Sequence, residues 1–351
     1  MLFDPVQLGD SSLRNRIVMA PMSQHAAGED GEPTDWHVEH YVARARGGCG
    51  TILLEDTAVE PAGRTSHAAL GLYEEAQIPA FRRVVDACRG HGVAVGLQLA
   101  HAGRKAFRDA RGDHRPLSAS AIAFADGWPA PIAADEDAIA RVCESFARAT
   151  RLAGVAGFDI VEVHAAHGYL LHQLLSPLTN RRGDSYGGPL EHRARLLLEV
   201  VEAVRAQWPA GNPLLVRLPA GDGAAEGATP AEGSTSVKGS TSAEMATVAR
   251  WCMQRGADLI DVAGGTPVLD GARAGSSEML AFAGLLRAGG AAPFALGGVT
   301  DGRSAEELLR ASGATLVTVG RPLLADPGWA LTAAAELNFE MPPLRRVRSI
   351  K

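Results

Sequence analysis

Three side chains that can donate hydrogen bonds or exchange protons lie close together near the middle of the chain. His164 and His167 are three residues apart, and Tyr169 follows two residues after the second histidine. The phenol has an ordinary pKa of about 10, so at neutral pH it is a proton donor. The apolar run 159–163 directly precedes this group and is typical of a buried strand. The pattern predicts a polar site at the mouth of a barrel.

Two kinds of chemistry fit the histidine pair. His164 and His167 could bind a metal ion, which requires a third ligand. His101 or Asp184 could supply that ligand, whereas we expect Glu162 to face away from the pair. Alternatively, both imidazoles could donate hydrogen bonds to one oxygen atom of a substrate. The spacing alone leaves both possibilities open.

The rest of the chain alternates short apolar runs with longer amphipathic stretches, eight times over. The apolar runs lack a polar alternation, as expected for strands that are buried on both faces. This order predicts a single α/β domain, a (β/α)8 TIM barrel, over a doubly wound sheet as the competing fold. The predicted strands are 16–22, 51–59, 93–99, 159–165, 213–219, 259–265, 293–299 and 315–321. The predicted helices are 35–48, 77–91, 135–156, 190–208, 241–256, 277–289, 303–312 and 325–337. Several predicted helices open with an acid or a hydroxyl, at Asp35, Asp135, Thr241 and Asp301.

The domain is predicted to span 1–351, with long loops on the active-site side. The loop 102–134 follows the third strand and is a candidate lid. The stretch 220–240 is rich in Gly, Ala, Ser and Thr and is predicted to be an excursion after the fifth strand. A basic tail, 339–351, ends the chain.

In such a barrel the chemistry lies at the carboxyl ends of the strands. Gly297 and Gly298 follow the seventh strand, and Gly320 and Arg321 follow the eighth. Backbone N–H groups and a guanidinium at neighbouring loops favour a phosphate site. The simpler alternative is that these glycines only form tight turns.

Gln98 and Arg217 are expected to point into the barrel mouth from buried strands. A buried arginine needs a partner, because an uncompensated charge there is costly. One alternative is an ion pair with Glu55, Asp56 or Glu162. The other is a ligand with acceptor atoms, such as the pyrimidine edge of a flavin.

Composition narrows the class of protein. With 351 residues, 46% of them hydrophobic, the chain can bury a large core. The net charge of −6, without a basic block, argues against a nucleic-acid partner. Neither a signal-peptide pattern nor an apolar run of roughly 18 residues is found, so we expect a cytoplasmic protein that does not bind membranes. Cys49, Cys88, Cys143 and Cys252 are far apart, which argues against a zinc ribbon or an iron–sulfur cluster.

Several segments resemble one known family. The segment 164–188, HAAHGYLLHQLLSPLTNRRGDSYGG, is similar to the signature of the old yellow enzymes, the FMN-dependent ene-reductases. The segments RNRIVMAPM at 14–22, QLAHAGRK at 98–105 and VGR at 319–321 are similar to other motifs of that family. The resemblance covers about residues 3–341 and is greatest to the thermophilic-like bacterial subclass.

The resemblance implies FMN as the cofactor, lying across the barrel mouth, and NADPH or NADH as the reductant. Gln98 and Arg217 would bind the pyrimidine edge of the flavin. The phosphate would be held by Gly297, Gly298, Gly320 and Arg321, and the ring would be lined by Pro21, Met22, Ser23 and Ala58.

The resemblance also implies a reaction and a substrate class. His164 and His167 would bind the oxygen of an electron-withdrawing group on an activated alkene, such as an enone, enal, maleimide or nitroalkene. Hydride would pass from flavin N5 to Cβ, and Tyr169 would protonate Cα. A homodimer or homotetramer is expected.

Three departures from the family pattern stand out. Ser23 occupies the position of a cysteine that tunes the flavin potential, and His25 that of a tyrosine that contacts substrate. The end of the chain lacks the family's Tyr-Glu-Arg-Gly-Trp, whose arginine enters a partner's active site, although Arg346 or Arg348 could substitute.

Two other functions are alternatives to the ene-reductase. One is a metal-dependent lyase or hydrolase that uses the histidine pair, and the other is a flavin-binding protein of low turnover.

Overall fold

A computed structural model of the chain describes residues 1–106, 115–222, 239–264, 276–291 and 293–342. Most of the 220–240 excursion, the middle of the 102–134 loop, and the end of the tail with Arg346 and Arg348 lie outside the described residues.

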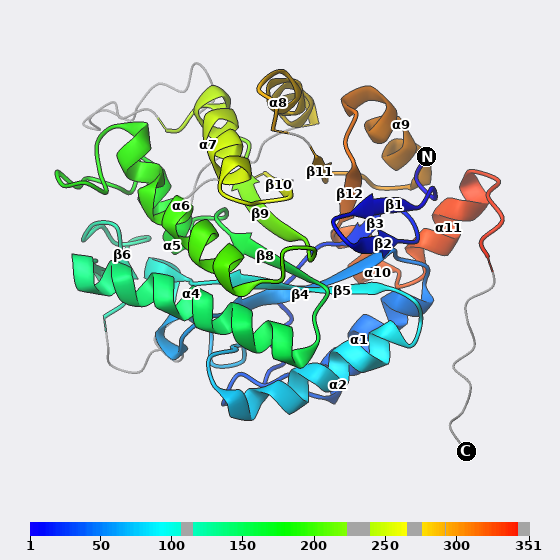
Figure 1. The fold of residues 1–351 in the computed structure, drawn as a ribbon, viewed down its shortest axis with the longest axis horizontal. Coiled ribbons are helices and arrows are strands. Elements are labelled where there is room, and N and C mark those ends of the chain that lie inside the picture. Colours follow the sequence, from blue (N-terminus) through cyan, green and yellow to red (C-terminus); the bar gives the residue numbers. More distant parts are fainter. Residues whose placement is uncertain (107–114, 223–238, 265–275, 292, 343–351) are drawn as a thin grey trace.

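Eight parallel strands form a closed barrel, with helices packed around it (Figure 1). Each of the eight predicted runs overlaps one barrel strand, with β5 ending one residue beyond its predicted run, so the predicted (β/α)8 barrel is confirmed. In order around the barrel the strands are β3 (Ile17–Met19), β4 (Thr51–Ala58), β5 (Ala94–Ala100), β8 (Ile160–His164), β9 (Leu214–Pro219), β10 (Leu259–Ala263), β11 (Phe294–Leu296) and β12 (Leu316–Val319).

The main helices follow the predicted amphipathic stretches. They are α1 (Asp35–Arg46), α2 (Ile78–Arg89), α4 (Glu136–Ala156), α6 (Leu190–Gln207), α7 (Ser242–Gln254), α8 (Ser276–Ala288), α9 (Gly302–Ser312) and α11 (Trp329–Glu336). The shorter helical elements are α5 (Leu170–Leu175), α10 (Arg321–Ala325) and the 3-10 turns η1 (Pro61–Gly63), η2 (Glu75–Gln77) and η3 (Gly103–Lys105). The predicted helix 325–337 was wrong at its start: α10 ends before Pro327, which has no N–H to continue a helix, and α11 begins afterwards.

Helix starts follow the predicted capping chemistry at three of four positions. The side chains of Asp135, Thr241 and Asp301 each accept a hydrogen bond from the backbone N–H three residues later. In the first helix Asp35 is the first helical residue and Thr34 is the N-cap. The acid there lies in the first turn, where it interacts favourably with the helix dipole.

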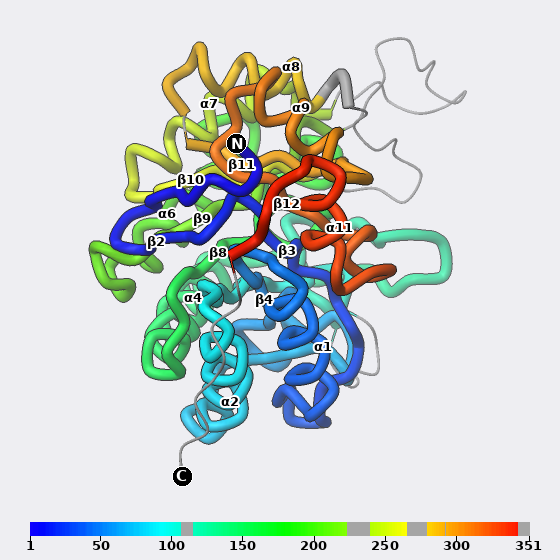
Figure 2. The backbone as a smooth tube through the Cα atoms, turned by 90° about the vertical axis from the view of Figure 1, so that its right-hand side faces the viewer, coloured from blue at the N-terminus to red at the C-terminus, as the bar shows by residue number. Residues whose placement is uncertain are grey.

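An N-terminal hairpin, which the sequence did not predict, closes the end of the barrel where the strands begin, opposite their carboxyl ends. Strands β1 (Val6–Leu8) and β2 (Ser11–Leu13) pair antiparallel, around a turn in which Gly9 has φ +53°. The view in Figure 2 faces the barrel end that this hairpin crosses. Leu8 and Leu13 pack in one buried cluster with a residue from each of seven barrel strands, and Ala94 of the eighth, β5, packs against it; the seven are Val18, Leu53, Ile160, Leu215, Leu259, Ala295 and Leu316. The hairpin leaves only the carboxyl ends of the strands for chemistry.

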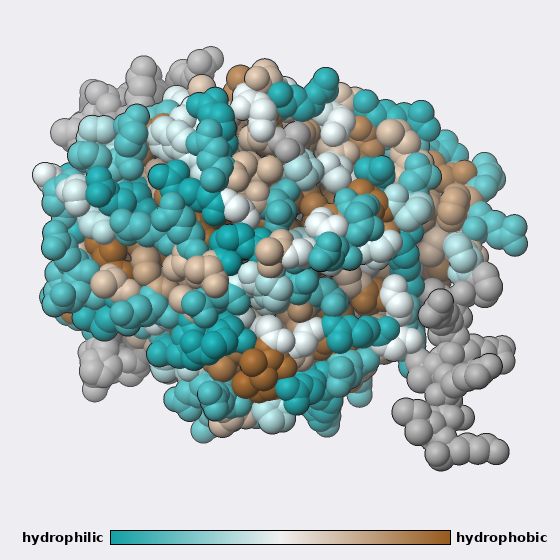
Figure 3. Space-filling view, in the orientation of Figure 1, coloured by the Kyte–Doolittle hydropathy of each residue, from teal (hydrophilic) through white to brown (hydrophobic). Residues whose placement is uncertain are grey.

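In the described part of the 102–134 loop, Lys105 Nζ donates a hydrogen bond to His167 C=O at 2.9 Å. Strands β6 (Leu117–Ser118) and β7 (Ile132–Ala133) pair with each other within it. One face of the molecule is largely hydrophilic, with hydrophobic residues in small separate patches (Figure 3). Among the described residues, no helix has both the length and the apolar character needed to cross a membrane.

Candidate active site

The histidine pair and the tyrosine meet at the carboxyl end of β8. His164, the last residue of that strand, is buried, and its Nε2 lies 3.1 Å from Nδ1 of His167. The centroid of the His164 ring lies 5.0 Å from that of His167 and 4.9 Å from that of Tyr169, both edge to face. The three predicted catalytic side chains therefore form one cluster, while their roles stay predictions.

An unusual turn presents this cluster. His167 has φ +54° and Gly168 φ +72°, and the left-handed region is uncommon for a histidine. Helix α5 holds the turn: Gly168 N–H donates to Nδ1 of His172 at 2.9 Å, and Nε2 of Gln173 donates to Gly168 C=O at 2.7 Å. His172 is fixed in turn by Asp222, whose Oδ1 lies 2.8 Å from its Nε2. These buried partners maintain a backbone conformation that would otherwise relax.

His164 has an atom available for a ligand. Its Nδ1 is buried and has no hydrogen-bond partner among the described residues. Burial, followed by the neighbouring His167, lowers its pKa well below the ordinary value, so the ring is neutral at pH 7. Because an unsatisfied buried polar atom costs free energy, a polar group of a ligand at this atom would be stabilising.

The carboxyl group of Asp56, which the sequence suggested only as a possible partner of Arg217, lies beside Tyr169 instead. Strand β4 carries a register shift between Leu54 and Thr57, so two acids occur where the neighbouring strand has one residue. Asp56 Oδ1 accepts a hydrogen bond from the Ser23 hydroxyl, and its Oδ2 lies 3.4 Å from the Tyr169 hydroxyl oxygen. Burial raises the pKa of Asp56 to about 7 and that of Tyr169 well above 10. Tyr169 therefore stays protonated at neutral pH.

The other acid of the bulge, Glu55, holds the segment that follows β3 and contains Gln24. Its Oε2 accepts from the Gln24 N–H at 2.7 Å, and its Oε1 accepts from the Tyr41 hydroxyl at 3.1 Å. Next in this segment, His25 is exposed and has φ +51°, and its Nδ1 lies 3.0 Å from Ser66 Oγ. Among the described residues no hydrogen bond links His25 to the histidine pair, and its contact with substrate stays a prediction.

Inside the barrel mouth, Arg217 pairs with a carboxylate that is not among its predicted partners. Its Nε lies 3.3 Å from Oδ2 of Asp261, and none of the three proposed acids, Glu55, Asp56 or Glu162, forms this ion pair. The reason is the strand order, since β9 pairs with β10 and Arg217 lies directly opposite Asp261.

The orientation expected for Glu162 was also wrong. It lies two residues before His164 and therefore shares its face of the strand. It is buried and accepts from Nε2 of Gln98 at 2.6 Å. Burial, and then mutual repulsion with Asp261, raises the pKa of Glu162, while Arg217 opposes that shift. The two buried acids and the half-buried arginine form one polar network.

The residues predicted to hold FMN fit that cofactor. Both Nη atoms of Arg217 donate to no described residue. A Cβ added at Gly298 would meet no atom within 4 Å, and one at Gly320 would lie 3.5 Å from Met22 Sδ. Arg321 is exposed, with no ion pair among the described residues. Gly298, Gly320 and the 21–23 segment follow three neighbouring barrel strands, β11, β12 and β3, and Arg321 adjoins Gly320, so this side of the barrel mouth is suited to an anionic, acceptor-rich ligand.

Two further predicted cofactor contacts can be placed. Pro21 and Ala58 are buried at the carboxyl ends of neighbouring strands β3 and β4. The N–H of Ala58 donates to Leu70 C=O and its C=O accepts from Leu72 N–H, both at 2.9 Å. The backbone N–H of Ala58 is therefore already satisfied, and its contact with the flavin ring stays a prediction.

The two candidate third metal ligands point elsewhere. Nε2 of His101 lies 2.8 Å from Glu60 Oε1, and Asp184 pairs with Arg182. Across the described parts of the chain, no group of three or more His, Cys, Asp or Glu residues is arranged to hold a metal ion. Within the described residues, the metal hypothesis therefore lacks the third ligand that it requires.

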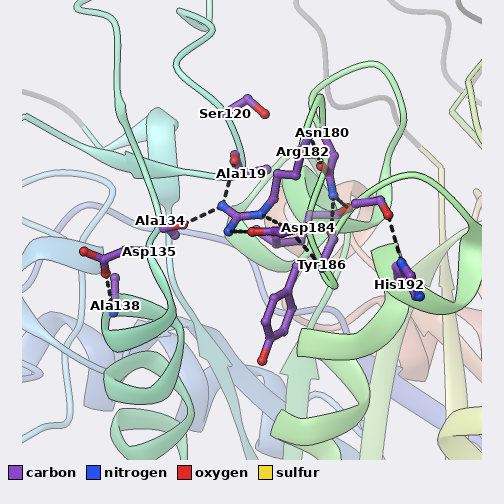
Figure 4. A network of polar contacts seen from close by, with 12 residues as sticks. Ala119, Ser120, Ala134, Asp135, Ala138, Asn180, Arg182, Asp184, Tyr186 and His192 are labelled. Carbon is purple, nitrogen blue, oxygen red and sulfur yellow. Dashed lines mark hydrogen bonds and ion pairs between the residues drawn. The ribbon is translucent and has the colours of Figure 1, made fainter.

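The second half of the signature segment is structural. Arg182 pairs with Asp184 and donates to the carbonyl oxygens of Ala119 and Ala134, which joins the 180–188 loop to the 117–134 segment (Figure 4). Asn180 Nδ2 donates to Tyr186 C=O at 2.7 Å and closes the loop. These residues act in the architecture around the site, whereas His164, His167 and Tyr169 face the site itself.

Comparisons with known proteins identify the family of the chain. The model of the NADH:flavin oxidoreductase / NADH oxidase family matches residues 1–340. An NADPH dehydrogenase of Listeria monocytogenes serotype 4b is 42% identical over 339 residues, covering 96% of this chain and 95% of that protein. An NADPH dehydrogenase of Bacillus subtilis is 39% identical over 343 residues, covering 97% and 96%.

Comparison with solved structures indicates the same family. Morphinone reductase superposes with a TM-score of 0.79 at 30% identity, covering 97% of this chain and 90% of that chain. The old yellow enzyme homologue from Zymomonas mobilis superposes with a TM-score of 0.80 at 27% identity, covering 98% and 94%. The chain belongs to the NADH:flavin oxidoreductase / NADH oxidase family, that of the old yellow enzymes, and is an FMN-dependent, NAD(P)H-dependent oxidoreductase.

Proposed function

We propose that this enzyme reduces activated C=C bonds, in enones, enals, maleimides and nitroalkenes. The observation that carries the proposal is the cluster at the end of β8, where a neutral His164 with an unpartnered buried Nδ1 adjoins His167 and Tyr169. Two neighbouring imidazoles, of which that of His164 is neutral, suit the binding of a carbonyl or nitro oxygen, and a protonated phenol next to them suits proton donation.

The protein's own residues bind and polarise the substrate. FMN, when bound and reduced, supplies the hydride. His164 and His167 hold the oxygen of the electron-withdrawing group, and this withdraws electron density from the conjugated C=C bond. Tyr169 keeps its proton until the substrate Cα takes it, because burial holds the pKa of the phenol well above 10. Arg217 stabilises negative charge at the pyrimidine edge of the flavin.

The function is tested by separating the two half-reactions. The purified enzyme is expected to be yellow, to bleach with NADPH without oxygen, and to regain its colour on addition of 2-cyclohexenone. Protein that retains no FMN, or reduced enzyme that no member of a panel of enones, maleimides and nitroalkenes reoxidises, would contradict the proposal.

Replacing Arg321 with alanine tests the phosphate site. A hydrogen bond to a charged group contributes more than a neutral one, so the Kd for FMN is expected to rise on the order of tenfold. Fluorescence titration of the FMN-free protein measures the Kd. Arg303→Ala, which changes an exposed arginine on α9, is the matched control and should leave it unchanged. Equal affinity of the Arg321→Ala variant and wild type would count against the assignment.

A further inference from the structure

Asp56 is a buried carboxyl group that touches the proposed proton donor. Only 7% of its surface is exposed, and among the described residues no cation forms an ion pair with it. Its two oxygens face different partners: Oδ1 accepts from the hydroxyl of Ser23, and Oδ2 lies 3.4 Å from the hydroxyl oxygen of Tyr169. The β4 bulge aims the carboxyl at these two groups.

The groups around Asp56 leave it close to the balance between its charged and neutral forms. Glu55 on the same strand repels a second negative charge, and the Ser23 hydroxyl stabilises it. Lys105, in the η3 turn, is bound through Nζ to His167 C=O at 2.9 Å and attracts the carboxylate without pairing with it. Tyr41 on α1 also faces the two acids. Burial dominates and raises the pKa of Asp56 to about 7.

We infer that Asp56 is a positioning residue whose protonation state decides where the O–H of Tyr169 points. This inference rests on the proposed function, in which Tyr169 protonates the substrate. A neutral Asp56 can donate from Oδ2 to the phenol oxygen, and this leaves the phenol proton free to point at the substrate. An ionised Asp56 can only accept, so it draws the phenol proton toward itself and away from the substrate.

Two consequences follow for the reaction. The O–H bond of Tyr169 breaks and a C–H bond forms at the substrate Cα only in the protonated form of Asp56. The rate of alkene reduction by the reduced enzyme should therefore fall as pH rises through about 7, by about tenfold for each further pH unit. Asp56→Asn keeps a donor toward Tyr169 and an acceptor for Ser23 and cannot ionise. This variant should show no inflection between about pH 6 and about pH 9.

The state of the Tyr169 hydroxyl can also be followed without an alkene substrate, by NMR, because the chain has few tyrosines. The chain contains four, so ring-labelled tyrosine gives four Cζ resonances in the NMR spectrum of the FMN-bound enzyme, and Tyr169→Phe identifies one of them. The Tyr169 resonance should shift with a midpoint near 7 in wild type, and should not shift over this range in Asp56→Asn. Glu199→Gln is the matched control, because Glu199 contacts another tyrosine hydroxyl, that of Tyr186, at 3.2 Å.

A second variant covers the case in which Asp56→Asn fails to fold. Ser23→Ala removes the hydrogen bond that lowers the pKa of Asp56, so the midpoint of the Tyr169 resonance should move to higher pH. A resonance that does not titrate in wild type, or an inflection that persists in Asp56→Asn, would overturn the inference. If the resonance titrates and no alkene is reduced, the proposed function is wrong and the coupling between Asp56 and Tyr169 stands.

Discussion

Replacing Tyr169 with phenylalanine is expected to slow alkene reduction on the order of 10²–10⁴-fold, the effect of losing a general acid. Reduction of the flavin by NADPH should be retained, because the phenol proton takes no part in that half-reaction. Stopped-flow absorbance of the flavin measures each half-reaction separately. The ring remains in place, so its edge-to-face packing on His164 is preserved.

The matched control is Tyr186→Phe, which removes a tyrosine hydroxyl that contacts Glu199 in the structural loop. It should leave both half-reactions near their wild-type rates. A Tyr169→Phe enzyme that loses both half-reactions to the same extent would refute the acid role, since the defect would then be one of flavin binding or folding.

Replacing Arg217 with methionine is expected to lower the free energy of unfolding by about 3–5 kcal/mol, because it leaves buried acids without their compensating cation. Asp261 loses its ion pair, and the pKa of Glu162, which Arg217 lowers, rises further. FMN should also be released, because the pyrimidine edge loses its positively charged donor. Denaturant unfolding and retained flavin absorbance measure the two effects.

The loss of stability in Arg217→Met should depend on pH in a defined direction. In the folded protein the pKa values of Glu162 and Asp261 are raised above those of the unfolded chain. The variant is therefore most stable at low pH, and it loses stability as the pH rises through the folded-state pKa values of these two acids. The double variant with Glu162→Gln should recover part of the loss. Arg255→Met, which breaks the partly exposed pair with Glu202, should cost at most about 1 kcal/mol. An Arg217→Met variant that is as stable as wild type at pH 8 would disprove this account.

The sequence by itself determined the barrel and the composition of its mouth. Apolar runs without alternation can satisfy their backbone and bury both faces only in a parallel sheet covered by helices, and eight such units favoured closure. The carboxyl ends of parallel strands meet at one end, so His164, Arg217 and Gly320 had to share a site. Local spacing was sufficient to place His167 and Tyr169 beside the first of these.

Only the tertiary structure decided which side chains pair across strands. Arg217 pairs with Asp261 because β9 and β10 are neighbours in a particular register, which no local pattern reports. The bulge in β4 interrupts the two-residue period and turns Asp56 toward Ser23 and Tyr169, contacts between residues far apart in the chain. Periodicity reports the local conformation of a segment, whereas these contacts depend on strand register and on a local break in it, and both are fixed only when the barrel closes.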